Sequence, residues 1–425
     1  MKHQESARPP FLPLEIVITL VVLAASAFAA SPAEKVLYSF QGGADGAGPI
    51  GKLIADAAGN LYGVTSAGGV TNCAGGCGTI FQLSPPQQPG GSWTETVLYR
   101  FTGGTDGAGP SAGMIFDQAG NLYGPTLVGG DASFDGTVFE LSPPTTQGGA
   151  WTETIIYRFQ GGNDGEYPRA ELVFDQAGNL YGTTFFGGSS GAGIVFQLTP
   201  PTQGDLWTET VLHTFHFDQD GGDPQSALLL DPHGALYGST FIGGVPGGGV
   251  VFKLKPPAGG GGWTEKVLYG FNGQRDGDQL SAGALLAGRN GTLYGAANLG
   301  GSLNSGTVFS VTPPGTQGGA WTETTLHTFA RGDGIFPLAG LVADQSGNLY
   351  GVTQGGGQGH AGTAFRLTPP QGQGDWTLTT LHAFRGGSDG AGPSGGLTPG
   401  KHGELFGVTA SGGSSSRGTV YQIVP

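Results

Sequence analysis

The stretch "WTETVLYRFTGGTDGAGP", Trp93 to Pro110, decides the fold, because recognisable copies of it return along almost the whole 425-residue chain. The marker "LYG" sets the register of the copies. Its glycine stands at Gly63, Gly124, Gly182, Gly238, Gly295 and Gly351, and a seventh copy, "LFG", ends at Gly407. The step between copies is 56 to 61 residues, a period typical of repeat architectures. The chain is therefore built from seven copies of one unit.

Each unit contains four extended segments. In chain order they read like "AGLVADQ" (Ala339 to Gln345), "NLYGTT" (Asn179 to Thr184), "GTVFELSPP" (Gly136 to Pro144) and "WTETIIYRF" (Trp151 to Phe159). All are rich in β-branched or aromatic residues and none has helical spacing. Short segments such as "DQAGN" (Asp117 to Asn121) supply tight turns. Four antiparallel strands per unit are therefore expected.

Seven four-stranded units are best accommodated in a closed ring. Radial packing covers both faces of each sheet and leaves only short edges. We therefore predict an all-β, seven-bladed β-propeller over residues 30–425, with a β-sandwich array and an open β-solenoid as alternatives. The chain starts with a strand of the outermost type and ends with one of the third type, "GTVYQIV" (Gly418 to Val424). We expect Ala33 to Phe40 to supply the fourth strand of the last blade.

Residues 1–29 differ from the rest and are predicted to be a signal peptide. Lys2 and Arg8 precede the apolar run Ile16 to Phe28, and "AFA" (Ala27 to Ala29) has the small-x-small pattern of a cleavage site. An uncleaved anchor is the alternative, but the run is short of the ~20 residues that span a bilayer. We expect a secreted or extracellular monomer, with the periplasm or cell surface also open, and no stable membrane insertion after cleavage.

Charge and cysteine content narrow the partners. The net charge is -14 and only 11% of residues are charged, so no basic stripe is present to bind nucleic acid. Cys73 and Cys77 in "CAGGC" are the only cysteines. In an exported protein a local disulfide is favoured, because a metal site would need further ligands.

The aspartate of "DGxxP" is the most chemically suggestive element of the repeat. It occurs in every unit, as Asp45, Asp106, Asp164, Asp220, Asp276, Asp333 and Asp389. These residues are candidates for a ligand face near the mouth of the central channel, where propeller loops gather. The alternative is that each aspartate caps its own turn. That alternative is favoured, because a turn device is needed in every unit and a reactive group only once or twice.

One unit departs from its siblings in a way that suggests a cation site. The segment "HFDQDGGDP", His216 to Pro224, adds His216, Asp218 and Asp223 to the standing Asp220. Carboxylates so closely spaced supply the oxygen ligands that calcium prefers. Asp218, Asp220 and Asp223 are therefore candidate calcium ligands, with a solvated acidic loop as the alternative. No other cofactor is expected.

A second departure lies in the third unit, which reads "DGEYPRAE" from Asp164 to Glu171. Here Glu166, Tyr167, Arg169 and Glu171 replace the small residues of a unit such as the second, which reads "DGAGPSAG" from Asp106 to Gly113. Glu166, Tyr167, Arg169 and the His216 of the fourth unit are candidates for ligand recognition. A loop salt bridge is the alternative interpretation of the third unit.

Catalytic signatures are not visible in the chain. It has no G-x-S-x-G elbow, zinc-spaced histidine pair or phosphate-binding glycine loop. We therefore predict no catalytic residues and a non-catalytic binding module for polysaccharide, a surface protein or another surface component. The competing hypothesis is a glycoside hydrolase or polysaccharide lyase that uses carboxylates on the "DGxxP" face.

The ordered combination of "LYG", "GTVF" and "DGxxP" resembles the GloVer tandem repeats of exported bacterial proteins, named for Gloeobacter and Verrucomicrobia. The resemblance extends from Ala33 to Pro425. It implies export, and family members typically carry a C-terminal surface anchor. This chain ends at "YQIVP" without a hydrophobic tail, so free secretion or periplasmic residence is expected.

Overall fold

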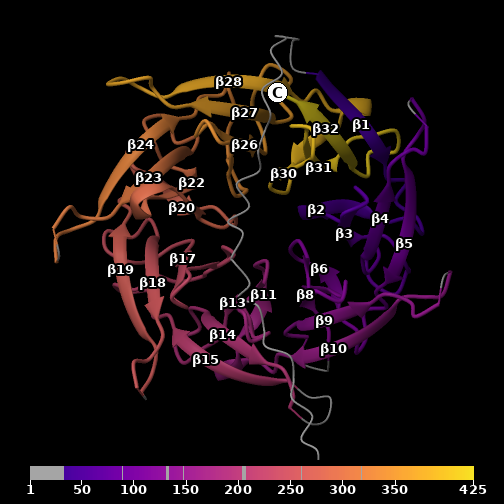
Figure 1. Ribbon diagram of the computed structural model, residues 1–425, viewed down its shortest axis with the longest axis horizontal. Coiled ribbons are helices and arrows are strands. Elements are labelled where there is room, and N and C mark those ends of the chain that lie inside the picture. Colours follow the sequence, from indigo (N-terminus) through magenta and orange to yellow (C-terminus); the bar gives the residue numbers. More distant parts are fainter. Residues whose placement is uncertain are drawn as a thin grey trace, which may run out of the picture.

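Seven small antiparallel sheets stand around a central axis (Figure 1). The computed structural model describes residues 33–88, 90–130, 134–146, 148–202, 207–259, 261–316 and 318–425; the signal-peptide prediction lies outside them. The predicted seven-bladed β-propeller is confirmed. No helix in the described ranges is long and apolar enough to cross a membrane.

The strands follow the predicted order, from the axis outward, in every blade. Blade one contains β2 (Ala47–Ala55), β3 (Leu61–Ala67), β4 (Thr79–Ser84) and β5 (Thr94–Arg100). Blade two contains β6 (Ala108–Pro110), β7 (Ile115–Phe116), β8 (Leu122–Val128), β9 (Thr137–Ser142) and β10 (Thr152–Arg158). Blade three contains β11 (Glu166–Pro168), β12 (Val173–Phe174), β13 (Leu180–Phe186), β14 (Ile194–Thr199) and β15 (Thr208–Thr214). Blade four contains β16 (Leu229–Leu230), β17 (Leu236–Ser239), β18 (Val250–Lys255) and β19 (Thr264–Gly270).

The remaining blades repeat this plan. Blade five contains β20 (Asp278–Leu280), β21 (Leu286–Ala287), β22 (Leu293–Leu299), β23 (Thr307–Thr312) and β24 (Thr322–Thr328). Blade six contains β25 (Val342–Ala343), β26 (Leu349–Thr353), β27 (Thr363–Thr368) and β28 (Thr377–Ala383). Blade seven contains β29 (Ala391–Pro393), β30 (Thr398–Pro399), β31 (Leu405–Ser411), β32 (Thr419–Val424) and β1 (Ala33–Ser39). Short 3-10 turns lie at Gly162–Asp164, Arg289–Gly291 and Gly387–Asp389.

The glycine of "LYG" is explained by close packing inside each sheet. A β-carbon added at Gly182 would lie 2.6 Å from the ring of Phe196 on β14 and 2.8 Å from Leu172. The third-strand phenylalanine therefore lies directly over the glycine, and a larger residue there would overpack the core.

The tyrosine of "LYG" and the tryptophan of the outermost strand pack between blades. Tyr62 of blade one lies 6.4 Å, centroid to centroid, from Trp151 of blade two. Tyr123 and Trp207 repeat the contact at 6.3 Å between blades two and three. Such edge-to-face pairs give the blade interface a defined geometry.

The N-terminal strand closes the ring as predicted. β1 pairs antiparallel with β32, from Ala33 opposite Val424 to Ser39 opposite Thr419, and the two ends of the described chain lie side by side (Figure 1). Phe40, directly after β1, is fully buried and its ring lies 5.1 Å from that of Phe81 in blade one. The N-terminal strand is therefore hydrogen-bonded into the last blade, and the residue after it packs against the first blade.

Candidate functional site

The "DGxxP" aspartates are hydrogen-bonded within the connections between blades. Tyr38 Oη and the backbone N–H of Gln41 donate to Asp45 Oδ2 over 3.0 and 2.8 Å. The same pairing of an outer-strand tyrosine or histidine with the following aspartate occurs at Tyr99–Asp106, Tyr157–Asp164, His213–Asp220, Tyr269–Asp276, His327–Asp333 and His382–Asp389. Each aspartate also accepts a hydrogen bond from a backbone N–H of its own connection, which is the contact that the turn-capping alternative predicts. None of the seven aspartates lines the central cavity.

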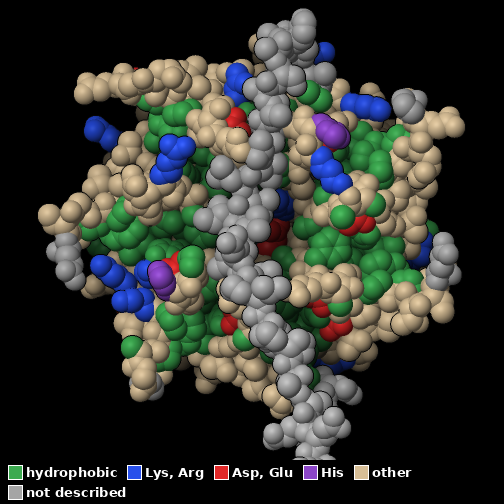
Figure 2. All heavy atoms as spheres, viewed as in Figure 1, with side chains coloured by type: hydrophobic (Ala, Val, Ile, Leu, Met, Phe, Trp, Pro, Cys, Tyr) green, Lys and Arg blue, Asp and Glu red, His purple; other side chains and the backbone are tan. Residues whose placement is uncertain are grey.

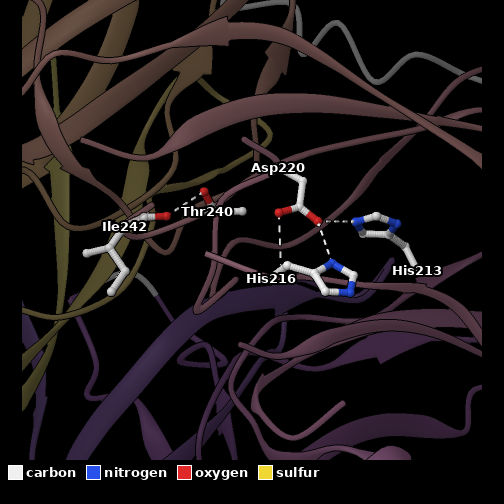
Figure 3. Close-up of polar contacts among 5 residues, drawn as sticks. All are labelled: His213, His216, Asp220, Thr240 and Ile242. Carbon is white, nitrogen blue, oxygen red and sulfur yellow. Dashed lines mark hydrogen bonds and ion pairs between the residues drawn. The ribbon is translucent and has the colours of Figure 1, made fainter. Parts of the chain in front are cut away.

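Asp220 shows this arrangement with an added histidine (Figure 3). Its Oδ2 atom lies 3.2 Å from His213 Nε2 and 3.1 Å from His216 Nδ1. Burial lowers the pKa of His213, although Asp220 opposes the shift. The side chain of His216 is half exposed in the loop. His216 therefore contacts the aspartate of its own turn while its side chain remains half exposed.

The three candidate calcium ligands differ in their surroundings. Asp218 is exposed, Asp220 is engaged by the two histidines, and Asp223 is only 7% exposed. Across the described ranges, the one group of three metal-ligating side chains with ligand atoms within 4.8 Å of one another is Glu34, His382 and Asp389. The carboxylates of blade four do not form such a group.

A carboxyl pair recurs at the interfaces between blades. Glu153 on β10 lies near Asp106, and burial, followed by that neighbouring charge, raises the pKa of Glu153 to about 7. Burial raises the pKa of the equivalent residues Glu34, Glu95, Glu209, Glu265 and Glu323 to the same value, about 7. None of these glutamates lines the central cavity. They belong to the packing of the outer strands.

A cavity of about 680 Å³ occupies the axis of the ring. Its wall is built mainly from glycine, alanine and aliphatic residues of the inner segments, such as Gly51, Ala112 and Gly283. Its charged residues are Lys52, Arg169 and Glu171. Acidic and basic side chains are visible at the centre of the ring in Figure 2. The cavity is therefore an apolar channel with its few charges contributed by blades one and three.

Glu171 and Lys52 are coupled inside this channel. Glu171 Oε1 accepts a hydrogen bond from the backbone N–H of Lys52 over 3.1 Å. Burial raises the pKa of Glu171, while the positive charge and N–H of Lys52 act in the opposite direction. Glu171 therefore links blade three to blade one through a backbone hydrogen bond. No ion pair within 4.0 Å among the described residues involves Glu166, Arg169 or Glu171.

The fourth residue of "DGxxP" adopts a left-handed backbone in all seven connections. Blades seven, one and two have glycine there, namely Gly392, Gly48 and Gly109, with φ of 63°, 61° and 59°. Blades three to six instead have Tyr167, Asp223, Gln279 and Phe336, with φ between 54° and 59°. A side chain in this conformation costs about 1 kcal/mol or more. Four neighbouring blades therefore have a strained non-glycine residue at this position, and the other three have an unstrained glycine.

These side chains lie beside the ends of the second strands. Tyr167 packs edge-to-face on Phe186 of β13, 5.9 Å between centroids. Gln279 accepts a 3.5 Å hydrogen bond from Asn298 Nδ2 on β22. We call the set Tyr167, Arg169, Phe185, Phe186, Asp223, Phe241, Gln279, Asn298 and Phe336 the mouth sector. It groups half-exposed aromatic rings with amide and charged groups on one side of the ring.

Arg169 joins the mouth sector to the cavity. Its guanidinium carbon lies 4.2 Å from the centre of the Phe185 ring, and the residue also lines the cavity. Phe185 lies 6.4 Å from Phe241 of the next blade. Burial raises the pKa of Asp223 to about 6, although the nearby positive charge of Arg169 acts in the opposite direction. The two departures noted in the sequence, in units three and four, therefore meet at one blade interface.

The remaining residues singled out in the sequence lie outside the mouth sector. Glu166 accepts a hydrogen bond from the backbone N–H of Gly162 over 3.2 Å and so closes its own loop. Cys73 and Cys77 form the predicted disulfide. Sequence reasoning missed Phe185, Phe241 and Lys52. Aligning the residue three places after each "LYG" glycine would have found the first two, because small residues such as Ser66 and Ala410 stand there in other units.

Comparison with solved structures shows the propeller fold. The extracellular domain of a putative one component system from B. thetaiotaomicron matches 89% of this chain with a TM-score of 0.51 and 11% identity. The chain spans 39% of that structure. The polysaccharide lyase Uly1 has a TM-score of 0.49 and 12% identity, over 88% of this chain and 90% of its own. PorZ, a surface component of the type-IX secretion system of Porphyromonas gingivalis, has a TM-score of 0.47 and 13% identity, over 88% and 46%.

Sequence comparison identifies the family to which the repeats belong. No curated protein sequence matches the chain. The model of the Gloeobacter/Verrucomicrobia repeat matches three overlapping ranges, residues 26–172, 145–317 and 260–425. Because these matches cover the entire propeller, the chain belongs to the Gloeobacter/Verrucomicrobia repeat family.

Proposed function

We propose that the protein is an exported, monomeric binding module that takes up polysaccharide at the mouth sector without chemical conversion. The observation that supports this most directly is the run of Tyr167, Asp223, Gln279 and Phe336 in left-handed backbone, where three other blades have glycine. Non-glycine residues that adopt a strained backbone in only some of the repeats are candidates for function. Their grouping in consecutive blades points to one extended binding surface.

The chemistry of the mouth sector suits a sugar chain. Tyr167 and Phe241 are partly exposed, and aromatic rings offer flat apolar surfaces to the C–H faces of a pyranose. Gln279 and Asn298 offer amide donors and acceptors for hydroxyl groups. Pockets that combine apolar surface with a few convergent polar groups are the usual setting for ligand binding. Polysaccharide is therefore favoured over a purely apolar ligand.

A glycine substitution provides the test of this proposal. Tyr167→Gly installs the residue that blades one, two and seven have naturally, so it removes the ring while relieving backbone strain. We expect the variant to fold with at least wild-type stability and to lose about tenfold or more in affinity for the polysaccharide identified on a glycan array. Ser416→Gly is the matched control, because Ser416 is exposed and also left-handed (φ 56°) but lies in the β31–β32 connection of blade seven.

Binding with no product is the expected companion result. Wild-type protein is incubated with the bound polysaccharide, and reducing ends and unsaturated products are measured. Turnover that Asp220→Asn abolishes without unfolding the protein would favour the hydrolase or lyase alternative. That alternative has less support, because the "DGxxP" carboxylates are held in hydrogen bonds to their own connections. Absence of binding to any glycan would contradict the proposed function itself.

A further inference from the structure

The wall of the central cavity contains more cationic than anionic side chains. Lys52 and Arg169 are the cations of its wall and Glu171 is its anion. Glu171 already accepts the N–H of Lys52, and burial raises the pKa of its carboxyl group, which disfavours the charged form. The wall of this cavity is therefore more positive than the protein as a whole, whose net charge is -14.

Arg169 lines the cavity and is not part of any ion pair within 4.0 Å among the described residues. Its planar group is stacked on Phe185, which fixes its orientation and leaves its edge free to donate hydrogen bonds. The ion pairs within 4.0 Å among the described residues involve His213, His216, Lys253, His327 and His382, and not Arg169. Burial of the half-buried guanidinium lowers the pKa of Arg169. A desolvated cation without a close counter-ion is costly until an anion arrives.

Asp223 does not fill this role in the structure. It lies outside the cavity wall, and its Oδ1 atom is buried with no hydrogen-bond partner in the described part of the chain. Asp223 therefore shares the electrostatic environment of Arg169 without neutralising it by direct contact. An arginine presented in this way matches the geometry of a carboxylate, which accepts two parallel N–H bonds.

We propose that the cavity mouth binds a carboxylate group of the ligand, with Arg169 as the primary contact and Lys52 as a second cation further along the wall. The carboxylate comes from a uronic acid residue of an acidic polysaccharide or from a free small carboxylate. The inference rests on the proposed function and narrows its ligand from polysaccharide in general to an acidic one.

Three probes separate these sources and test the charge requirement. They are an oligogalacturonate, the same oligosaccharide with its carboxyl groups methyl-esterified, and free galacturonate, each titrated calorimetrically against the full mature protein. We expect the oligogalacturonate to bind at least about tenfold more tightly than its methyl ester. Galacturonate binding as tightly as the oligomer would identify the small carboxylate as the ligand.

Variants then connect binding to the named residue. Arg169→Gln introduces the residue that the equivalent position of blade four has, Gln225, so the fold should tolerate it. We expect a loss of about tenfold or more in oligogalacturonate affinity, and partial retention in Arg169→Lys, which keeps the charge but not the fork. Arg275→Gln, at an exposed loop position of blade five, is the control and should bind like the wild type.

The outcomes distinguish the two proposals. Equal affinity for the acid and its methyl ester, or an Arg169→Gln variant that binds oligogalacturonate normally, overturns the carboxylate site. If neutral glycans bind in a Tyr167-dependent manner while oligogalacturonate and galacturonate do not, the carboxylate site fails and the binding module stands. If none of these probes and no glycan on the array binds, both fail.

Discussion

Glu171 of blade three reaches past blade two and accepts a hydrogen bond from the backbone N–H of Lys52 in blade one over 3.1 Å. The residue that makes this possible is Gly113, the corresponding residue of blade two. A β-carbon added there would lie 2.5 Å from Glu171 Oε1 and 2.6 Å from the carbonyl oxygen of Lys52. Glu171 of blade three and the peptide group of Lys52 in blade one are thus joined across Gly113 of blade two, which has no side chain to obstruct the contact.

Gly113→Ala should therefore destabilise the ring. The methyl group must displace Glu171 or the Lys52 backbone, and overpacking of this kind typically costs about 1–3 kcal/mol. The free energy of unfolding from urea titration measures the effect. Gly43→Ala is the control, because a β-carbon at Gly43 would meet nothing within 4 Å. Equal stability of the two variants would show that the Glu171 link does not constrain the axis.

The closing strand gives a second prediction. Phe40 after β1 and Phe215 after β15 are both fully buried, 5.1 and 5.2 Å from the phenylalanines Phe81 and Phe252 of the sheets they cover. Phe40→Ala and Phe215→Ala should each lower the free energy of unfolding by about 3–5 kcal/mol. A much smaller loss for Phe40→Ala would mean that β1 contributes little to the ring. Deletion up to Phe40 should likewise lower the melting temperature.

The histidines that replace tyrosine in three outer strands give a third prediction. His382 Nε2 lies 2.9 Å from Asp389 Oδ1, in the place where Tyr99 Oη donates to Asp106 over 3.0 Å in blade two. His382→Tyr should therefore preserve stability within about 0.5 kcal/mol. His382→Phe removes the contact and should cost about 1–3 kcal/mol. Thermal unfolding distinguishes the two, and equal destabilisation by both would argue that the ring shape, and not the polar contact, matters.

Repetition made the fold predictable from sequence. The seven "LYG" markers fix the blade number, and the terminal strands Ala33–Ser39 and Thr419–Val424 reveal the closure. The recurrence of Asp45 and its equivalents favoured a turn device, and each of these aspartates accepts a backbone hydrogen bond within its own connection. Each of these inferences used a pattern that local sequence and strand pairing enforce in every unit.

The site was only partly predictable, because it depends on contacts between units. Tyr167, Arg169 and Asp223 stood out as departures from the repeat, yet their sequence neighbours did not reveal that Arg169 stacks on Phe185 or that Asp223 lies beside it. The Glu171 contact crosses a whole blade, joining residues 119 positions apart. Calcium was suggested by the spacing of Asp218, Asp220 and Asp223, but these three carboxylates do not form a group with ligand atoms within 4.8 Å of one another, and Asp220 is engaged by two histidines.

The glutamates between blades give a fourth prediction, on pH. Burial raises the pKa of Glu34, Glu95, Glu153, Glu209, Glu265 and Glu323 to about 7, from 4.5 in an unfolded chain. The folded protein therefore binds more protons than the unfolded chain between these pH values. Their stabilising contribution is full below pH 4.5 and is lost as the pH rises through 7. The free energy of unfolding should accordingly fall from pH 5 to pH 8.

Other groups modify this slope without reversing it. Asp223, whose pKa is raised to about 6, acts in the same direction, and the lowered pKa of His213 acts in the opposite one. Urea denaturation at pH 5, 6, 7 and 8 measures the slope. The double variant Glu153→Gln with Glu209→Gln should flatten it, because two of the six contributing groups no longer titrate. Glu140→Gln, on the third strand of blade two, is the control for charge removal. A wild-type stability that rises between pH 5 and pH 8 would contradict the prediction. In blade six Leu378 occupies the position of the glutamate, so the blade forms without a titratable group there.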